Sequence, residues 1–452
     1  MPPNFLFIVL DDLNAWIGAL GRHPNAYTPN IDALAARGIL FTNAYCSVPY
    51  CNASRMGMYT GRLAPNLGVY HNEPFWDAAE RPATLMERLR ARGYATIGAG
   101  KVFHGVFDYE QALFDRLGHA PWKEVENRDD NWDIFHPNLE EPLPPGRPLN
   151  QLFDFSAPDS VPAMYRLFDW GPCAPDQEAA LPDERSVDAL VRFLEQPTSA
   201  PFFCAAGLYK PHLPWHAPQR FFDLIPEDVA LPLVRPDDLD DAPEIARAWA
   251  LNPPDHELVT SRGVWKQAVR AYLACIAYAD HLVGRLIEAL ERGGAGDATT
   301  VILCGDNGYH LGEKLHWRKF ALWEEATRVP LIYAPAGRRT HQRITEPVSL
   351  IDIFPSVLAD AGADPGPVDG QRFEATVAGA GRETPVISTW GRGNHSLRTA
   401  RWRYTRYSDG SEELFDHAID GHEWTNLCGA PAFDAVREDL RAMLARAVAA
   451  EL

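Results

Sequence analysis

The stretch NFLFIVLDD, residues 4–12, decides the fold class of this chain. An unbroken apolar run such as 5–10 is typical of a strand buried on both faces of a parallel sheet. Asp11 and Asp12 follow at once, where this strand is expected to end. Because ligand sites in open parallel sheets lie at the carboxyl ends of strands, the stretch predicts an α/β protein with a polar site at one edge of its sheet.

Further apolar runs alternate with helical patterns along the chain. Thr28 and Pro29 mark the start of a helix that Gly38 ends, and Gly93 ends a second helix expected over 82–92. This alternation predicts a large, mostly parallel central sheet flanked by helices. The expected strands are 4–10, 94–98, 202–207, 299–304 and 329–333, and the longest expected helix is about 267–292.

The character of the sequence changes twice. From about 105 to 184 Pro, Asp, Trp and Phe occur without a clear period, which indicates a loop-rich insertion that shapes a substrate mouth. We therefore expect a catalytic domain over 1–379 and a small C-terminal α+β subdomain with antiparallel strands over 380–452. The elements expected in this subdomain are strands at 386–390, 401–407 and 413–415 and a terminal helix at 432–452.

Composition excludes several classes of partner. The chain of 452 residues has 42 Lys and Arg against 61 Asp and Glu, a formal net charge of -19, which argues against nucleic acid or an anionic membrane. Seven scattered cysteines favour a reducing compartment over a disulfide framework. The apolar run at the N-terminus is too short for a signal peptide or a membrane span, so we expect a cytoplasmic protein.

A second polar strand end follows the expected strand 299–304. Asp306 and Asn307 stand there, although Asp-Asn-Gly read alone is more often a turn. If this end lies beside Asp11 and Asp12, three carboxylates and an amide oxygen form an all-oxygen cation site. Such a site suits Ca²⁺, with Mg²⁺ or Mn²⁺ as alternatives, rather than Zn²⁺.

The stretch CNASR begins at Cys51, just before a helix expected over 54–59. A helix N-terminus favours an anion and an oxyanionic nucleophile, and Arg55 can hold such a group by charge-assisted hydrogen bonds. Read alone, a cysteine in this setting is usually an inert buried thiol. The stretch, with Thr-Gly-Arg at 60–62, resembles the activation signature of type I sulfatases, in which the Cys is oxidised to formylglycine.

Three more segments resemble the same family in the same order. Lys101 and His104 close the stretch GYATIGAGKVFH, which is similar to the second sulfatase signature. Lys210 and His212 come from the stretch YKPH. Lys319 lies in the stretch WRKF, and its neighbour Arg318 is expected at the surface. The spacing of Lys101 and His104 and the Lys-Pro-His segment look closest to the iduronate-2-sulfatase-like branch.

The resemblance implies an alkaline-phosphatase-like sandwich fold and a sulfuric ester hydrolase. Formylglycine at position 51 would attack the sulfate monoester and form a covalent sulfo-enzyme intermediate beside a divalent metal. The implied metal ligands are Asp11, Asp12, Asp306, Asn307 and Cys51. The implied catalytic roles are nucleophile for Cys51, charge stabilisation for Arg55, Lys101 and Lys319, leaving-group acid for His212, and base for His104, Asp11 or Asp12.

Two features depart from the family pattern. Ala53 replaces the usual Pro of the activation motif, which bears on the formylglycine-generating enzyme that would mature this Cys. The leader that we expect to be absent would distinguish this chain from lysosomal and secreted relatives. No oligomeric state follows from the sequence.

Two other functions stay open. A phosphodiesterase or phosphonate monoester hydrolase uses the same fold, because a metal, an anion pocket and an activated nucleophile serve phosphorus as well as sulfur. A catalytically silent metal-binding homologue would keep Cys51 as a thiol. The sequence does not indicate whether the leaving group is a sugar, an aryl group or an alkyl group. Candidate mouth residues, which fit packing equally well, are Tyr70, His71, Trp76, Lys210, Trp215 and 390–395 including His395.

Overall fold

The computed structural model describes residues 2–72, 81–104, 131–137, 147–154, 161–196, 198, 200–382 and 384–449. Trp76 and much of the predicted insertion 105–184 lie outside the described residues. Two strands are described within that insertion, although its sequence indicated loops. β4 (Ile134–Pro137) extends the main sheet, and β5 (Trp170–Cys173) pairs with β7 (Trp215–Pro218) in a separate parallel pair.

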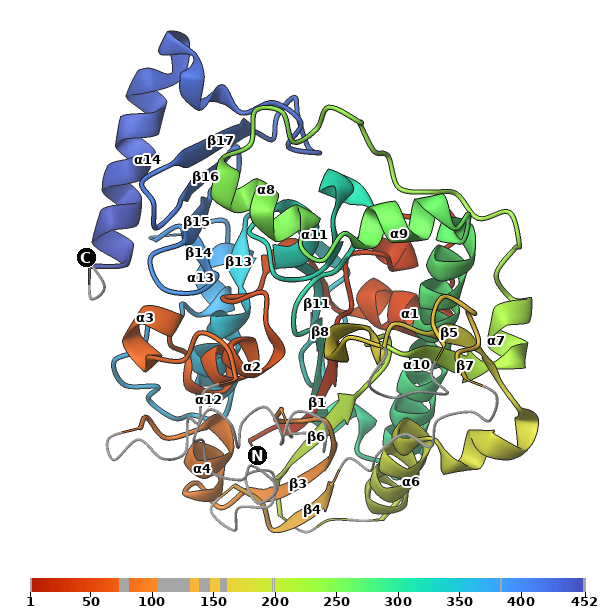
Figure 1. Ribbon diagram of the computed structural model, residues 1–452. Helices are drawn as coiled ribbons and strands as arrows, with labels where there is room; N and C mark the ends of the chain where they lie inside the picture. Colours follow the sequence, from red (N-terminus) through yellow and green to blue (C-terminus); the bar gives the residue numbers. More distant parts are fainter. Residues whose placement is uncertain are drawn as a thin grey trace.

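A mixed sheet of nine strands forms the centre of the molecule (Figure 1). Its order is β12-β2-β11-β8-β1-β6-β3-β4, and β13 also pairs with β2. Within the described sheet, β11 alone runs antiparallel to its neighbours. The bounds are β1 Asn4–Leu10, β2 Ile39–Tyr45, β3 Ala95–Gly100, β6 Phe202–Leu208, β8 Thr299–Gly305, β11 Arg328–Ala334, β12 Gln342–Ile344 and β13 Val348–Ser349.

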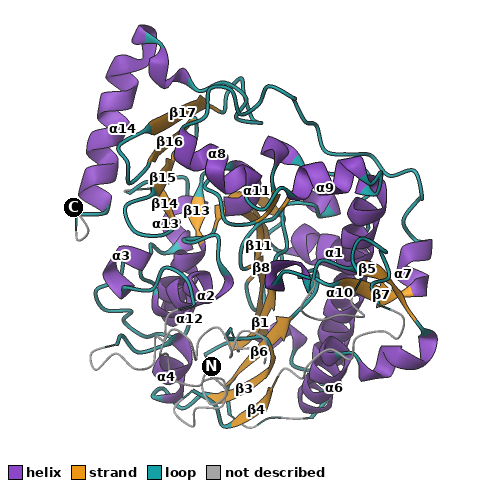
Figure 2. Ribbon diagram, in the orientation of Figure 1, coloured by secondary structure: helices purple, strands orange, loops and turns teal. Residues whose placement is uncertain are grey.

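Helices cover both faces of this sheet (Figure 2). The side chains of β1 alternate between two hydrophobic cores, one containing Leu6 and Ile8 and the other Phe5 and Phe7. This alternation is what a strand buried on both faces requires. The first core lies under α1 (Pro29–Arg37), α6 (Pro182–Leu194) and α10 (Trp265–Arg292), and the second under α2 (Cys51–Thr60), α4 (Leu85–Arg90) and α12 (Ile353–Asp360).

A four-stranded antiparallel sheet, β14-β15-β16-β17, forms a small unit near the C-terminus. α14 (Asp434–Ala447) packs on it through Leu440 and Leu444, and the pair stands at the upper left of Figure 1. The predicted class, a helix-flanked central sheet with a small antiparallel subdomain, is confirmed. The strands are β14 Val386–Thr389, β15 His395–Arg398, β16 Trp402–Arg406 and β17 Glu412–Asp416.

Some predicted element bounds were wrong. α2 begins at Cys51 and not at Ser54. α4 begins at Leu85 because Thr84 caps it: Glu87 N–H donates to Thr84 Oγ1, and Thr84 N–H donates to the Glu87 carboxylate at 2.7 Å. The remaining elements are α3 Ala64–Leu67, α7 Gln219–Asp223, α8 Glu244–Leu251, α9 Asp255–Ser261, β9 His310–Leu311, β10 Trp317–Arg318, α11 Glu324–Thr327 and α13 Phe373–Val377.

A search of the described helices for a membrane-spanning segment finds none that combines the necessary length and apolar character.

Candidate functional site

The carboxyl ends of β1 and β8 bring three carboxylates together. The two strands are parallel neighbours in which Leu10 is opposite Gly305, so the residues that follow them share one edge of the sheet. Asp12 N–H donates to Asp306 Oδ1 at 3.0 Å. Oxygens of Asp11, Asp12 and Asp306 lie within 4.8 Å of one another, and all three side chains are buried.

Asn307 completes an oxygen-rich cluster. Its amide nitrogen donates to Asp12 Oδ1 at 2.7 Å and to the Gly308 carbonyl at 2.9 Å. Its buried Oδ1 has no hydrogen-bond partner among the described residues. A buried amide oxygen without a donor beside three carboxylates fits a hard divalent cation, which takes carboxylate and amide oxygens as ligands.

Each carboxylate faces a cationic side chain from a different part of the chain. Lys101, just after β3, forms an ion pair with Asp11. Lys319 Nζ lies 2.5 Å from Asp12 Oδ1. Arg55 Nε, on α2, lies 2.9 Å from Asp306 Oδ2, and its Nη2 lies 3.6 Å from Asp11 Oδ1. Three positive groups therefore converge on the same strand ends and can bind the oxygens of a tetrahedral anion.

Burial and charge move the pKa values of these groups. Burial raises the pKa of Asp306 to about 7, and the nearby Asp11 charge adds to this rise. Burial is the largest single influence on Asp11 and would raise its pKa, but the surrounding positive groups, Lys101 first among them, together hold that pKa well below its usual range. Burial opposes the positive charges on Lys101 and Lys319, yet the neighbouring acidic groups, Asp11 first for Lys101 and Asp12 first for Lys319, together raise both lysine pKa values. The lysines therefore stay cationic at neutral pH.

Cys51 is the first residue of α2 and lies against this cluster. Its Sγ is 2.7 Å from Lys319 Nζ and 4.0 Å from Asp12 Oδ1. The side chain is buried, and burial together with the Asp11 charge raises the thiol pKa well above its ordinary value. An unmodified thiol here is protonated at neutral pH and is therefore a weak nucleophile.

Hydrogen bonds from α2 hold Cys51 in place. Ser54 Oγ donates to the Asp306 carbonyl at 2.5 Å. Arg55 Nη1 donates to the Val102 carbonyl at 3.0 Å, and the Tyr59 hydroxyl donates to the same carbonyl at 2.9 Å. These bonds tie the helix to the ends of β8 and β3. The sequence did not single out Ser54 and Tyr59 as site residues, and the only signal was their place in or beside the cysteine motif.

Of the two predicted histidines, His212 approaches the carboxylate cluster, and His104 lies near Lys101. His212 Nδ1 lies 2.6 Å from the Leu213 carbonyl, and its Nε2 lies 3.7 Å from Asp12 Oδ2. Burial lowers the His212 pKa to about 4, so the imidazole is neutral at neutral pH and its Nε2 is free of a proton when Nδ1 donates to that carbonyl. His104 is buried in the turn that follows β3, three residues after Lys101.

The predicted substrate-binding residues spread over several places. Lys210 Nζ donates to the Pro214 carbonyl at 2.7 Å. Trp215 is fully buried among four aromatic rings of the core: Trp170, Tyr272, Tyr309 and Trp317. His395 lies on β15, where its Nδ1 is 2.9 Å from Thr389 Oγ1, and it borders a cavity of about 150 Å³ against α14. These contacts do not bring Trp215 or His395 to the carboxylate cluster.

Tyr70 and His71 pack instead against the segment that follows β14. The guanidinium of Arg392 lies 4.6 Å from the Tyr70 ring centre, and the His71 ring meets Trp390 edge-on at 4.8 Å. Trp390 also packs on two aromatic rings, Tyr50 and Phe320, at 5.6 and 5.4 Å. Tyr50 precedes Cys51 and Phe320 follows Lys319, and this adjacency was the one sequence signal for a shared aromatic cluster.

Arg318 was expected at the surface beside Lys319, and that expectation was wrong. Its guanidinium is largely buried, and its Nε lies 2.6 Å from Asp255 Oδ2 on α9. The ion pair connects the β10 strand to α9.

Comparisons with known proteins agree on one family. The sequence profile of the family described as Sulfatase matches residues 3–363. A sulfatase of Formosa agariphila is 32% identical over 460 residues, covering 98% of this chain and 86% of that protein. The human iduronate 2-sulfatase is 28% identical over 358 residues, covering 74% of this chain and 60% of that protein.

Solved structures share the fold. The phosphonate monoester hydrolase of Agrobacterium radiobacter superposes with a TM-score of 0.74 at 20% identity, covering 100% of this chain and 96% of that one. A 2-O GAG sulfatase superposes with a TM-score of 0.74 at 19% identity, covering 99% and 92%. The solved structures share the alkaline-phosphatase-like fold, and the family profile and the curated relatives agree: this chain is a sulfatase and belongs to the sulfatase family.

Proposed function

We propose that this enzyme hydrolyses a sulfate monoester by means of a formylglycine made from Cys51, and that a divalent cation, Ca²⁺ in the first place, assists it. One observation carries the proposal: the Cys51 side chain meets both the Lys319 ammonium, at 2.7 Å, and the oxygen cluster around Asp12. At position 51 a nucleophile would therefore lie beside both an anion-binding cation and the proposed metal ligands. The raised thiol pKa supports conversion of Cys51, because the thiol itself is a weak nucleophile there.

The protein's own residues would divide the work as follows. Asp11, Asp12, Asp306 and Asn307 would hold the cation, which supplies polarisation of the sulfate group and of the nucleophile. Arg55, Lys101 and Lys319 would bind the sulfate oxygens and stabilise their charge in the transition state. The formylglycine hydrate would attack sulfur and displace the alcohol, leaving a covalent sulfo-enzyme. Its remaining hydroxyl, deprotonated by His104 or an aspartate, would then expel sulfate and restore the aldehyde.

His212 would protonate the departing alcohol. Because its pKa is about 4 in this arrangement, the imidazole needs a proton before it can act as an acid. The negative charge of the bound ester, and the further charge that develops on the leaving oxygen in the transition state, raise the basicity of Nε2, so proton uptake would accompany substrate binding. The lysines oppose that uptake, and their pairing with Asp11 and Asp12 limits the opposition.

The substrate and partners are proposed more broadly. The similarity to the human iduronate 2-sulfatase supports an iduronate-2-sulfatase-like branch and a saccharide sulfate, although small-molecule sulfate esters fit the same chemistry. A formylglycine-generating enzyme is the partner that Cys51 requires. Cytoplasmic location and the domain boundary near residue 380 stay predictions.

The test begins with the covalent state of position 51. Mass spectrometry of the tryptic peptide that ends at Arg55, from protein made in its native host, should show a species about 18 Da lighter than the Cys form. Cys51→Ala should abolish ester hydrolysis without loss of the folded state, and the matched variant Cys46→Ala should retain hydrolysis. A peptide that is entirely thiol, or sulfatase turnover in Cys51→Ala, refutes the proposal.

A second candidate is hydrolysis of a phosphonate monoester or phosphate diester. The likeness to the phosphonate monoester hydrolase favours it at the level of the fold. Rates on an aryl sulfate, a phosphate diester and a phosphonate monoester, measured on one preparation, separate the two: the sulfate ester should have the highest kcat/KM. Metal binding without turnover of any of the three would identify a silent homologue.

A further inference from the structure

The segment from Lys314 to Glu324, which we call the lysine segment, carries Lys319 to the site with an unusual backbone. Four of its non-glycine residues have left-handed φ angles: Lys314 58°, Leu315 49°, Arg318 80° and Phe320 46°. Such conformations are costly for residues with a side chain and persist only where surrounding contacts enforce them. Something outside the segment must therefore hold it.

The first part of the lysine segment is held by the catalytic domain. His316 lies between two carbonyls, with Nε2 2.8 Å from the Lys319 carbonyl and Nδ1 3.1 Å from the Ala250 carbonyl. Lys314 Nζ lies 2.8 Å from Asp238 Oδ1 and also donates to the Glu423 carbonyl. Glu423 belongs to the C-terminal part of the chain, so the anchoring already crosses to the small subdomain here.

The last part of the lysine segment is held from the C-terminal subdomain. Arg403 Nη1 donates to the Leu322 carbonyl at 3.1 Å. Glu324 N–H donates to Glu423 Oε2 at 2.8 Å, and Trp323 Nε1 lies 3.3 Å from Glu413 Oε1. Three consecutive residues, starting three positions after Lys319, thus each bond to β16, β17 or the turn that follows them.

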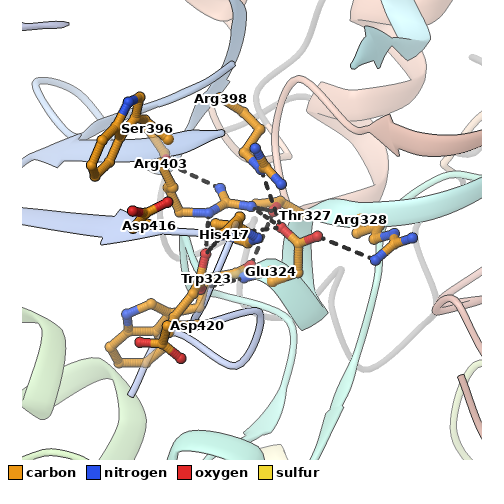
Figure 3. A network of polar contacts seen from close by, with 12 residues as sticks. Trp323, Glu324, Thr327, Arg328, Ser396, Arg398, Arg403, Asp416, His417 and Asp420 are labelled. Atoms are coloured by element: carbon orange, nitrogen blue, oxygen red, sulfur yellow. Dashed lines mark hydrogen bonds and ion pairs between the residues drawn. The ribbon is translucent and has the colours of Figure 1, made fainter. Parts of the chain in front are cut away.

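Arg403 is the centre of this connection (Figure 3). Its Nη2 donates to Glu324 Oε2 at 2.5 Å, and its Nε forms an ion pair with Glu423. His417 Nε2 lies 2.8 Å from Glu423 Oε1, and Arg398 Nε lies 3.7 Å from Glu324 Oε2. The carboxylates and the Arg403 guanidinium are buried, so the network is shielded from solvent and salt.

A cation site is the competing explanation for this cluster. Glu324, His417 and Glu423 place ligand atoms within 4.8 Å of one another, as metal ligands do. However, the guanidinium of Arg403 bonds to both carboxylates, and Arg398 approaches Glu324 as well. Positive charge already fills the space between the acids, which favours an ion-pair network over a metal.

We propose that Arg403, through its bonds to Leu322, Glu324 and Glu423, is a positioning residue that sets the place of the Lys319 ammonium in the active site. The C-terminal subdomain is then part of the catalytic apparatus, although Arg403 touches no substrate. The role given to Lys319 in this inference rests on the proposed function, whereas the contacts that link Arg403 to the lysine segment are independent of that function.

The first variant is Arg403→Lys, which keeps the charge and loses the planar fork that reaches Leu322, Glu324 and Glu423 together. The matched control is Arg401→Lys. Arg401 lies two residues away and pairs with Asp416 at 2.6 Å, and its side chain is 58% exposed. Its ion pair with Asp416 and its contact with the Trp402 ring both lie outside the lysine segment. Glu423→Gln, which keeps the shape of the acceptor for Glu324 N–H, is a second variant should Arg403→Lys fail to fold.

The first readout is a double-mutant cycle with Lys319→Ala, scored on kcat and KM for whichever ester the wild type cleaves. Arg403→Lys should lower kcat/KM at least tenfold at a temperature far below its Tm, and Arg401→Lys should change it less than twofold. If Arg403 acts through Lys319, adding Lys319→Ala to Arg403→Lys should cost much less than it costs the wild type. Additive losses, or unchanged kcat/KM in Arg403→Lys, overturn the inference.

The second readout does not depend on activity. Amide hydrogen exchange in peptides that cover 311–324 should become at least tenfold faster in Arg403→Lys and stay unchanged in Arg401→Lys. If the wild type cleaves no ester, the proposed function fails, and this readout alone still decides the inference. Unchanged exchange in both Arg403→Lys and Glu423→Gln overturns it.

Discussion

Gly207 on β6 offers a sharp test of how tightly the site is built. A Cβ added there would lie 2.0 Å from the Lys101 carbonyl carbon and 2.1 Å from its oxygen. Side-chain carbons keep at least about 3.0 Å from such atoms, so Gly207→Ala must move the Lys101 backbone by about 1 Å. The displaced carbonyls of Lys101 and Val102 are the acceptors of the Arg55 guanidinium. Two of the three cations of the site therefore move together.

The expected cost follows from that displacement. A misplacement of about 1 Å in a catalytic group can reduce the rate about 100-fold, and overpacking of this kind costs about 1–3 kcal/mol of unfolding free energy. We expect Gly207→Ala to lose about 100-fold in kcat/KM and to melt at a lower temperature. The assay is steady-state hydrolysis of the preferred ester, with thermal unfolding followed by circular dichroism to confirm that the variant is folded at the assay temperature.

The matched control is Gly429→Ala, because an added Cβ at Gly429 meets no atom within 4 Å. This variant should keep the activity and the melting temperature of the wild type. The reasoning is refuted if Gly207→Ala retains kcat/KM within threefold of the wild type, because the added Cβ would then fit without displacing the Lys101 backbone enough to affect catalysis.

Three further predictions address the metal, a buried acid and the anion pocket. Removal of divalent cations should abolish turnover and lower Tm, and Ca²⁺ at 100 times its Kd should restore about 2.7 kcal/mol of stability in calorimetry, whereas an unchanged Tm would contradict the site. Burial raises the pKa of Asp280 to about 6 in the folded protein, so the folded state favours the protonated carboxyl. The contribution of Asp280 to the free energy of unfolding is therefore complete below about pH 4 and is lost as the pH rises through 6. Urea unfolding of wild type and Asp280→Asn should therefore diverge by about 3 kcal/mol between pH 4 and 7, and parallel curves would count against this. Lys319→Met should weaken inhibition by inorganic sulfate at least tenfold in steady-state assays, and equal inhibition would exclude Lys319 from the anion pocket.

The strand pattern could be predicted where the sequence is unambiguous. The strand 4–10 and the helix 29–37 have the bounds that their apolar run and their Thr, Pro and Gly signals indicated. β15 was missed because its sequence HSLR carries three polar residues, yet all four side chains are buried: Leu397 lies in the apolar core, and the three polar side chains meet polar partners. Period alone cannot identify a strand whose polar groups are satisfied inside the fold.

The candidate site, like the fold, could be predicted from the sequence only in part. Short motifs fix which residues follow a strand end, so the meeting of Asp11, Asp12 and Asp306 could be predicted from topology. The side to which an aromatic residue faces could not be predicted in this way: Trp215 was grouped with the mouth residues, but it lies in the core. Arg403 lies in the stretch RWRY, which resembles the family at its C-terminal end, but the sequence assigned it no role because its importance comes from tertiary contacts with residues about 80 positions away.

The antiparallel direction of β11 has a consequence for recombination between relatives. Because β8 and β11 are adjacent and oppositely directed, residues 306–327 leave the sheet and return at the same edge, with no crossover to the opposite end. Such an excursion can be exchanged between homologous proteins without altering the order of the strands. A chimaera that receives only 306–327 would, however, present a foreign Leu322 and Glu324 to Arg403 and Glu423. Functional chimaeras should therefore inherit 306–327 and 403–423 as one unit, and these two distant stretches should be exchanged together.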